Sequence, residues 1–429
     1  MKQMKKLLLI LMVILSSCVS QGNREKAKNN GKVTIKGTFV QTWLCASWNN
    51  TQWDTEFAAL KEAGMEYLII APMLQVDENG NKSALYPSAM HPDAPDVLEK
   101  CLQHAQKNGF KVFLGLNMNE RWWKVNYPGY WLDEQMEIGN KVADEILARY
   151  KNRYGETLYG WYWVWEVDNL NWNTDEKRNM LANALNINLD HLSEVSPDMP
   201  LMLSPFMNYR VGVNAEGYGQ LWKEVFAQAH FRPGDIFAPQ DCLGAGGLTF
   251  DLLPKWFDHL KAAVETKSGL LFWSNVENFE QHSWVSATMD KYAQQIEMER
   301  PYVSGMITFA YSHYYSPLAC NRMLHDAYVY YYKNGCLPEV AVPKPVSNAT
   351  LTKDGQGNNV LQWTLPEAEP NLLGVRIYKN SNLIRYLQTD KTGVCVTSFT
   401  DENSLLSDLT YQITTYNVIG KESVAITVN

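Results

Sequence analysis

The feature that most constrains the fold is an alternation of short apolar runs with amphipathic helical patterns, repeated eight times between residues 37 and 333. The runs expected to form strands are 37–43, 66–72, 111–117, 159–166, 200–205, 235–239, 269–275 and 305–311. Between them, apolar residues recur at helical spacing, as Leu98, Leu102 and Ala105 illustrate. Eight strand–helix units of this length predict an α/β fold, a (β/α)8 TIM barrel. A doubly wound sheet is disfavoured because no Gly-rich loop follows the first strand.

The chain changes character after the last helical pattern. Residues 342–345 read Val-Pro-Lys-Pro, which is typical of a linker, and the remainder alternates in the manner of strands with no helical pattern. We therefore expect a catalytic barrel domain over 33–337 and a small all-β sandwich over 343–429. The second segment carries Trp363, Tyr378, Asp401, Tyr411, Gly420 and Ser423. On these residues it resembles a fibronectin type III module, an immunoglobulin-like sandwich.

The N-terminal segment predicts export and lipid anchoring. Residues 1–6 hold three lysines, residues 7–15 are continuously apolar, and Leu-Ser-Ser-Cys follows at 15–18. This pattern is typical of a lipoprotein signal peptide over 1–18 whose lipobox ends at Cys18, the expected lipidation site; an ordinary signal peptide with a chance cysteine is the alternative. Residues 19–32 are polar and predict a flexible tether. The expected location is the cell envelope, anchored in the outer membrane and facing the periplasm or the surface.

Composition narrows the classes of partner. A net charge of −8 and a pI near 5.6 argue against binding nucleic acid, since no basic surplus exists to neutralise phosphates. The 15 Trp and 23 Tyr suit a protein that handles neutral sugars, although most of these rings will be core. Neither the histidines nor the cysteines other than Cys18 have metal-ligand spacing. We expect no metal, no cofactor and a monomer, and the spacing leaves any disulfide pairing open.

Two glutamates follow barrel strands at the end where TIM barrels carry their chemistry. Glu166 ends the fourth predicted strand, and Glu277 follows the seventh. Glycoside hydrolysis needs two carboxyls that flank one bond. The pair therefore predicts a glycoside hydrolase, whereas a single carboxylate at a strand end would more often be structural.

Other polar or aromatic residues at the strand ends are candidates for binding the sugar, and each could equally be structural. The candidates are Gln41, Trp43, Asn117, Asn119, Trp165, Gln240, Asp241, Asn275, Tyr311 and His313. The glycine-containing segment 244–247 predicts a flexible substrate loop. Loop tryptophans at 122, 123, 172 and 284 either stack on sugar rings or pack beneath the loops.

The two glutamates resemble the catalytic pair of clan A glycoside hydrolases, which carry them on strands four and seven. That resemblance implies that Glu166 is the acid/base, that Glu277 is the nucleophile, and that the mechanism is retaining. Clan A enzymes normally have Asn directly before the strand-four glutamate, and Trp165 stands there. At whole-chain level, residues 238–241 (APQD), 273–280 (WSNVENFE) and 309–311 (FAY) resemble a bacterial lipoprotein family described as a domain of unknown function. That resemblance implies a glycosidase-like barrel and names no substrate.

Two functions are consistent with these patterns. The first is a glycoside hydrolase acting on an oligo- or polysaccharide at the cell envelope through Glu166 and Glu277. The alternative is a glycan-binding lipoprotein that keeps the barrel and lacks catalysis, which the residue at position 165 favours.

Overall fold

The structure is a computed structural model that describes residues 33–124, 126–402 and 409–428. The predicted signal peptide (1–18), the lipidation site Cys18 and the tether (19–32) lie outside the described residues. A compact unit begins at Val33.

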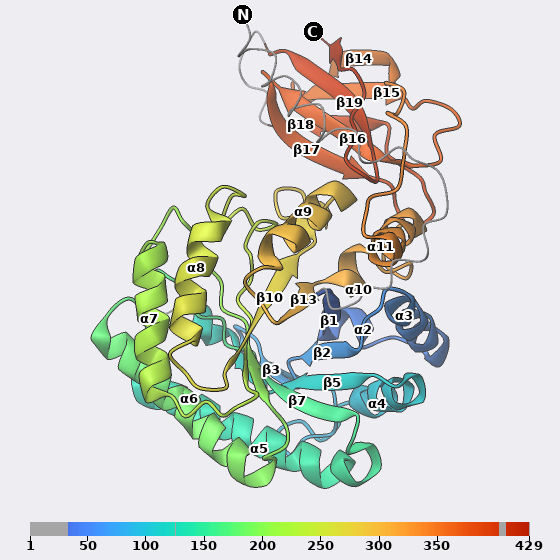
Figure 1. Cartoon of the computed structure of the whole chain (residues 1–429). Helices are drawn as coiled ribbons and strands as arrows, with labels where there is room; N and C mark the ends of the chain where they lie inside the picture. The colour runs from blue at the N-terminus through green and yellow to red at the C-terminus, as the bar shows by residue number, and fades with distance from the viewer. Residues whose placement is uncertain (1–32, 125, 403–408, 429) are drawn as a thin grey trace, which may run out of the picture. The chain divides into compact units, whose positions relative to one another are not determined.

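Eight parallel strands close into a barrel, which confirms the predicted fold class (Figure 1). Around the barrel the strands are β1 (Ile35–Gln41), β2 (Tyr67–Ala71), β5 (Lys111–Gly115), β7 (Leu158–Trp163), β8 (Leu201–Leu203), β9 (Ile236–Phe237), β10 (Leu271–Glu277) and β13 (Gly305–Phe309), and β13 pairs with β1. All eight coincide with a predicted strand. The carboxyl ends of the strands therefore meet at one mouth.

Helices cover the outside of this barrel (Figure 1). The main ones are α3 (Asn50–Glu62), α4 (Val97–Asn108), α5 (Gly129–Tyr154), α6 (Asp175–Val195), α7 (Ala215–Gln228), α8 (Leu253–Val264), α9 (Met289–Glu299) and α11 (Arg322–Asn334). Their ends follow local signals. Asn49 and Gln52 form a capping box at the start of α3, and Gly109 ends α4 with a positive φ of 75°.

The barrel strands are apolar on both faces because both faces are buried. Helices pack against the outer face. The inner face is filled by a cluster of buried side chains: Phe39, Ile69, Phe113, Tyr162, Met202, Ile236, Ala238, Ile307 and Ala310. The interior is thus a packed core, and any ligand must bind above it, among the loops that follow the strands.

Strand boundaries differ from prediction where they matter for the site. Strand β7 ends at Trp163, because its pairing with β8 covers only Trp161–Trp163, so Glu166 lies in the loop beyond it. Strand β10 extends to Glu277, which pairs with Phe309 of β13. Trp43 lies in the short helix α2 (Thr42–Cys45) and not in the first strand.

Several short strands and helices follow the barrel strands at the mouth of the barrel. A small sheet holds β3 (Leu74–Val76), β4 (Lys82–Ala84) and β6 (Asn117–Asn119), and the 3-10 helix η1 (Glu120–Lys124) follows it. A two-stranded ribbon of β11 (Phe279–Glu280) and β12 (Val285–Ser286) follows β10, and α10 (Tyr311–Tyr314) follows β13.

The C-terminal segment forms two antiparallel sheets, consistent with the predicted small all-β sandwich. One sheet holds β14 (Ser347–Lys353), β15 (Asn359–Thr364) and β18 (Ser398–Asp401); the other holds β16 (Leu372–Lys379), β17 (Asn382–Gln388), β19 (Tyr411–Asn417) and β20 (Ile426–Val428). Trp363 and Tyr411 belong to its buried core. Its likeness to fibronectin type III remains a prediction.

Two features of the described chain concern covalent links and membranes. All six cysteines within it are free, so none of them forms a disulfide. No helix among the described residues has the length and apolar character needed to span a bilayer.

Candidate active site

The two glutamates lie at the same mouth of the barrel and line one cavity. Glu277 is the last residue of β10, and Glu166 lies three positions after the end of β7. Both contribute to a cavity of about 350 Å³, together with Gln240, Ala245 and Trp284. Parallel strands thus bring together two carboxyls that are 111 positions apart in the chain.

A second cavity of about 230 Å³ adjoins the first. The two share three lining residues: Glu166, Gln240 and Phe309. Other polar and aromatic residues that line the second cavity come from barrel strands and from the segments that follow the first three of them; they include Gln41, Trp43, Gln75, Glu120, Trp123 and Asn275. Glu166 therefore faces both cavities, whereas Glu277 faces only the first.

Glu166 has one side-chain partner. Gln240 Nε2 donates to Glu166 Oε1 at 3.0 Å and also reaches the Ser204 carbonyl at 3.2 Å. Burial raises the pKa of Glu166 to about 7, and the bond from Gln240 opposes that shift. The loop is held from outside the cavity, because Trp122 Nε1 donates to the Glu166 carbonyl at 3.0 Å. A carboxyl that titrates near neutrality can give and take a proton at physiological pH.

Glu277 has more partners, and they are backbone donors. Ala245 N–H donates to Glu277 Oε2 at 2.6 Å, and the Gly244 N–H also favours the ionised form. Burial raises the pKa of Glu277 well above its ordinary value, the negative charge of Asp241 raises it further, and Ala245, Lys291 and Gly244 oppose this. The loop passes so close that a Cβ on Gly244 would lie 2.6 Å from the Phe279 carbonyl oxygen. Glycine is therefore required there.

Asp241 does not line either cavity, which corrects its prediction as a substrate-binding residue. Its side chain is fully buried. Oδ1 accepts the N–H groups of Leu243 at 3.1 Å and Glu277 at 3.3 Å, and Oδ2 accepts Gln295 Nε2 at 2.7 Å. The carboxylate is thus used to hold the backbone around Glu277.

Besides Gln240, three predicted contact residues line the second cavity: Gln41, Trp43 and Asn275. Trp43 Nε1 donates to Gln41 Oε1 at 3.2 Å, and the Trp43 ring is 68% exposed. Asn275 Nδ2 donates to Ser204 Oγ at 3.0 Å, which leaves Asn275 Oδ1 without a partner. A buried amide oxygen with no partner is suited to accept a hydrogen bond from a ligand hydroxyl.

His313 supports the second cavity from behind its wall. Its Nε2 accepts the Gln41 N–H at 3.2 Å, and its ring packs against Trp43 and Phe309. Burial lowers the pKa of His313 to about 4, so the imidazole is neutral at pH 7. The neutral imidazole therefore accepts the Gln41 N–H and so orients the Gln41 backbone.

Besides Asp241 and His313, four more predicted contact residues are not brought into either cavity, which corrects their assignment. Asn117 donates to the Gln135 carbonyl of α5 at 3.0 Å, and Trp165 packs in an aromatic cluster on the outer side of the strand ends. Asn119 Oδ1 accepts the Arg121 N–H at the start of η1 at 3.0 Å. Tyr311 is fully buried and shares a 2.8 Å hydrogen bond with His325. Each has a local structural partner.

The loop tryptophans divide into two pairs. Trp123 and Trp284 are 52% and 61% exposed, and each lines one of the two cavities. Trp122 and Trp172 are buried and stack on each other with ring centroids 5.1 Å apart. The first pair is placed to meet a ligand, and the second supports the loops.

Sequence reasoning missed Gln75 and Glu120. Gln75 lies on β3 and donates to Glu120 Oε1 at 2.8 Å; both line the second cavity. Residues 74–76 gave no strand signal of their own because β3 is short and pairs outside the barrel. Glu120 could have been found, since it follows the polar end of the third predicted strand.

A loop bridge fixes the floor of the mouth near Glu166. The buried Asn169 donates through Nδ2 to the carbonyls of Asn208, Val211 and Val213 at 3.1, 2.7 and 2.8 Å. Its Oδ1 accepts the Asn208 N–H at 2.9 Å. One side chain after β7 thereby satisfies several backbone groups of the loop after β8.

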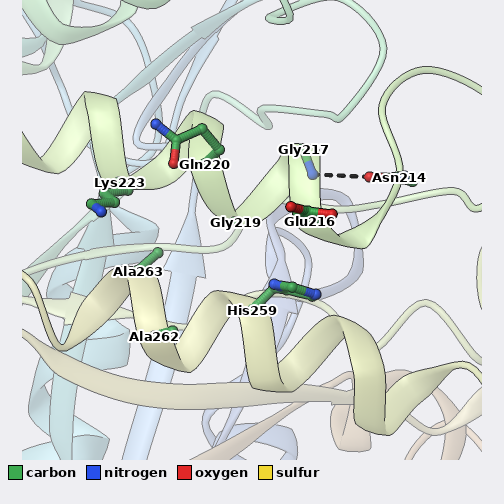
Figure 2. Close-up of a pocket in the computed structure, with 9 residues that line it drawn as sticks. All are labelled: Asn214, Glu216, Gly217, Gly219, Gln220, Lys223, His259, Ala262 and Ala263. Carbon is green, nitrogen blue, oxygen red and sulfur yellow. Dashed lines mark hydrogen bonds between the residues drawn. The ribbon is translucent and has the colours of Figure 1, made fainter.

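A larger hollow, of about 580 Å³, lies away from the mouth between α7 and α8. Figure 2 shows the residues that line it, among them Glu216, Lys223 and His259, on the facing sides of the two helices. It contains no residue from a strand end, so we place no chemistry there. Among the described residues, no group of three or more acidic, histidine or cysteine side chains could hold a metal ion.

Known proteins resemble this chain at two levels. A solved structure from Bacteroides thetaiotaomicron, described as a candidate alpha-L-fucosidase, aligns with a TM-score of 0.60 at 22% identity over 73% of this chain and 100% of its own, which supports the fold alone. A chitinase from Bacillus thuringiensis aligns over 92% of this chain and 84% of its own with a TM-score of 0.43 and 10% identity, too low to support an argument.

Sequence comparison identifies a curated relative and the family. The uncharacterised protein YbcH of Escherichia coli (strain K12) is 26% identical over 193 residues, which are 42% of this chain and 56% of that protein, so this chain spans about half the relative's length. Residues 35–321 match the family described as "Domain of unknown function (DUF4434)". That match covers the barrel and all of the residues that line the two cavities. The chain therefore belongs to the DUF4434 family.

Proposed function

We propose that this protein hydrolyses glycosidic bonds of an oligo- or polysaccharide, with Glu166 as acid/base and Glu277 as nucleophile. The observation that carries the proposal is that both carboxyls line one cavity at the carboxyl end of the barrel. Amide groups and exposed indoles surround them. Sugar hydroxyls can form hydrogen bonds with the amide groups, and the C–H faces of sugar rings can stack on the indoles.

The difference in hydrogen-bond donors supports these roles. Glu166 receives one amide N–H, and its pKa of about 7 suits a group that must be protonated when the leaving oxygen departs. Glu277 receives backbone N–H groups from Ala245 and Gly244, which favour its carboxylate form. Activity therefore requires pH above the raised pKa of Glu277 and declines as the pH rises through that of Glu166.

The proposed reaction consists of two displacements at the anomeric carbon. A Glu277 carboxylate oxygen attacks the anomeric carbon; the bond from that carbon to the leaving oxygen breaks, and the leaving oxygen takes the proton of Glu166. In the second step the Glu166 carboxylate takes a proton from water, and the water oxygen displaces Glu277 from the anomeric carbon. Two displacements retain the anomeric configuration.

We further propose that the reaction takes place at the cell envelope, with the barrel held to the membrane by a lipid on Cys18. This part rests on the N-terminal sequence pattern over residues 1–18. Metabolic labelling with an alkyne fatty acid would test it: wild type should be labelled and Cys18→Ala should not.

The matched test compares Glu166→Gln with Glu277→Gln in the full chain, purified in detergent, against a panel of plant and host polysaccharides. New reducing ends should appear with wild type, and each variant should lose at least about 10²-fold in kcat while still binding the glycan. Glu216→Gln, on the surface of α7, is the control and should match wild type. Full activity in either site variant contradicts the assignment.

A substrate with an activated leaving group distinguishes the acid/base role of Glu166 from the nucleophile role of Glu277. On an aryl glycoside of the released sugar whose phenol needs no protonation, Glu166→Gln should keep its first step, and Glu277→Gln should not. Equal losses in both variants would contradict the division of roles.

A non-catalytic glycan-binding protein is the second candidate, and one observation favours it. Trp165 is buried and packs against Trp122 and Trp131, so nothing at that position reaches the sugar as the clan A asparagine does. Binding of a polysaccharide by wild type without any new reducing end would favour this function.

A further inference from the structure

Two more carboxyls lie next to Glu277, and neither lines a cavity. They belong to Asp241, in the loop after β9, and to Glu299, the last residue of α9. Both side chains are fully buried. Within the described residues neither takes part in an ion pair with a lysine, arginine or histidine. Buried carboxyls without a cation are uncommon, and these two are in contact with each other.

Hydrogen-bond donors are distributed unevenly over the pair. Asp241 accepts the N–H groups of Leu243 and Glu277 on Oδ1 and the amide of Gln295 on Oδ2. Neither oxygen of Glu299 accepts an N–H donor from the described residues; its neighbours are the Asp241 carboxyl and the Ser274 hydroxyl. Donors favour the ionised form of Asp241, and their absence favours the neutral form of Glu299.

The titratable groups around the pair do not supply a compensating charge. Glu277, from β10, is another acid, and Cys242 and Tyr292 are buried with pKa values raised above their ordinary range by that burial. Lys291 of α9 donates to Glu280 Oε1 at 2.9 Å and to the Leu243 carbonyl at 3.2 Å, so its charge is paired elsewhere. Two touching carboxylates in such surroundings cannot both stay ionised.

We propose that Asp241 and Glu299 share one proton at neutral pH, carried by Glu299 and donated to Asp241, and that this pair positions Glu277. Burial, and then the charge of Asp241, raise the pKa of Glu299 well above its ordinary value, in agreement with this assignment. The shared proton lets the Glu299 carboxyl, which accepts no N–H donor from the described residues, donate to Asp241. This hydrogen bond fixes the orientation of the Asp241 carboxylate.

The link to Glu277 runs through its backbone. Asp241 Oδ1 accepts the Glu277 N–H, and Gln295 Nε2 donates both to Asp241 and to the Glu277 carbonyl, the latter at 2.8 Å. Gln295 and Glu299 lie one turn apart on α9, so the helix presents both to the end of β10. Asp241, Gln295 and Glu299 are positioning residues. Their effect on turnover rests on the proposed function, whereas the existence of the shared proton does not depend on that function.

Thermal unfolding against pH tests the proton without any substrate. A group whose folded pKa is raised stabilises the fold most at low pH, and that contribution is lost as pH rises toward the folded pKa. In Glu299→Gln the side chain at position 299 is neutral at every pH. Its melting temperature relative to wild type should therefore increase between about pH 5 and about pH 8, by up to about 1.5 °C per pH unit.

Glu297→Gln is the matched control, because Glu297 is an exposed glutamate on the same helix. Its difference from wild type should not increase with pH. Parallel curves for Glu299→Gln and wild type, or a Glu299→Gln protein that does not fold at about pH 5, overturn the proposal, since the variant copies the protonated state.

Infrared difference spectroscopy gives a second readout. Glu299 should contribute to the carboxylic-acid C=O stretching band of wild type at neutral pH, so the band should be weaker in Glu299→Gln and unchanged in Glu297→Gln. An unchanged band in Glu299→Gln overturns the proposal, whichever way the melting curves run.

The positioning role is tested by two neutral replacements of similar size. Glu299→Gln can donate to Asp241 and should keep kcat within about twofold of wild type, whereas Glu299→Leu cannot donate and should lower kcat by about tenfold with little change in KM. Equal activity of both variants overturns the positioning role. Absence of hydrolysis in wild type would instead reject the proposed function and leave the melting and infrared results standing.

Discussion

The surroundings of Glu166 and of Glu277 differ although both residues lie at the carboxyl end of the same barrel. Glu166 faces two cavities and receives one side-chain amide. Glu277 faces one cavity, and the loop 241–247 and helix α9 hold both its carboxylate and its own peptide groups. Burial raises the pKa of each. Burial alone therefore does not distinguish an acid from a nucleophile, whereas the number and kind of hydrogen-bond donors does.

The largest expected effect comes from disturbing the side of Glu277. In Gly244→Ala the new methyl group would lie 2.6 Å from the Phe279 carbonyl oxygen and 2.9 Å from Glu277 Cβ. The loop must shift, which displaces the Ala245 N–H from Glu277 and lowers kcat by about 10²-fold. Overpacking should also cost about 1–3 kcal/mol of folding free energy, measured by urea unfolding.

Gly246→Ala is the control for that prediction. A Cβ at Gly246 meets no atom within 4 Å, although its φ of 70° makes the variant strained. It should lose stability without a comparable loss of kcat. Equal kcat losses in the two variants would show that loop strain, and not the contact with Glu277, is responsible.

An intermediate effect is expected on the side of Glu166. Gln240→Ala removes the bond that lowers the pKa of Glu166 against burial. The folded pKa should rise above about 7, so Glu166 stays protonated to higher pH and the alkaline limb of the kcat/KM profile should move to higher pH. The pH–rate profiles of wild type and variant measure this. A shift to lower pH would mean that Glu166 is not the group that must be protonated.

The smallest effect should come from Asp168, a further carboxyl close to Glu166 in the chain. Asp168 accepts the N–H groups of Leu170 and Asn171 at 2.7 and 2.5 Å, in a turn directly after Glu166. Asp168→Asn keeps one acceptor oxygen and should cost about 1 kcal/mol of unfolding free energy or less. Turnover should be unchanged in a standard rate assay. A large loss of kcat would place a third acid in the chemistry and break the two-carboxyl comparison.

Much of the fold could be predicted because each barrel strand is buried on both faces and therefore reads as a continuous apolar run. The site was harder to predict, since successive residues at a strand end point to opposite sides. Gln240 and Glu166 line cavities, while their neighbours Asp241 and Trp165 are buried away from them. Asn275 and Glu277, two positions apart, both face the mouth.

The residues that sequence reasoning misplaced lie where the chain leaves the barrel. Asn117 belongs to β6, which pairs with β3 and not with a barrel strand, so the alternation of the third strand no longer applies to it. Gln75 enters the second cavity from that same small sheet. Such positions depend on loop pairing, which the periodicity of a single strand does not encode.

The Asn169 bridge has a consequence for how the mouth can vary. Because one amide is bonded to three carbonyls and one N–H of the loop that follows β8, the segment between β7 and Asn169 cannot change length without disturbing the segment 208–213. An insertion before Asn169 or within 208–213 must therefore be matched by a change in the other segment. Grafting experiments that aim to alter which sugar is accepted should therefore exchange the two loops together, as a single cassette.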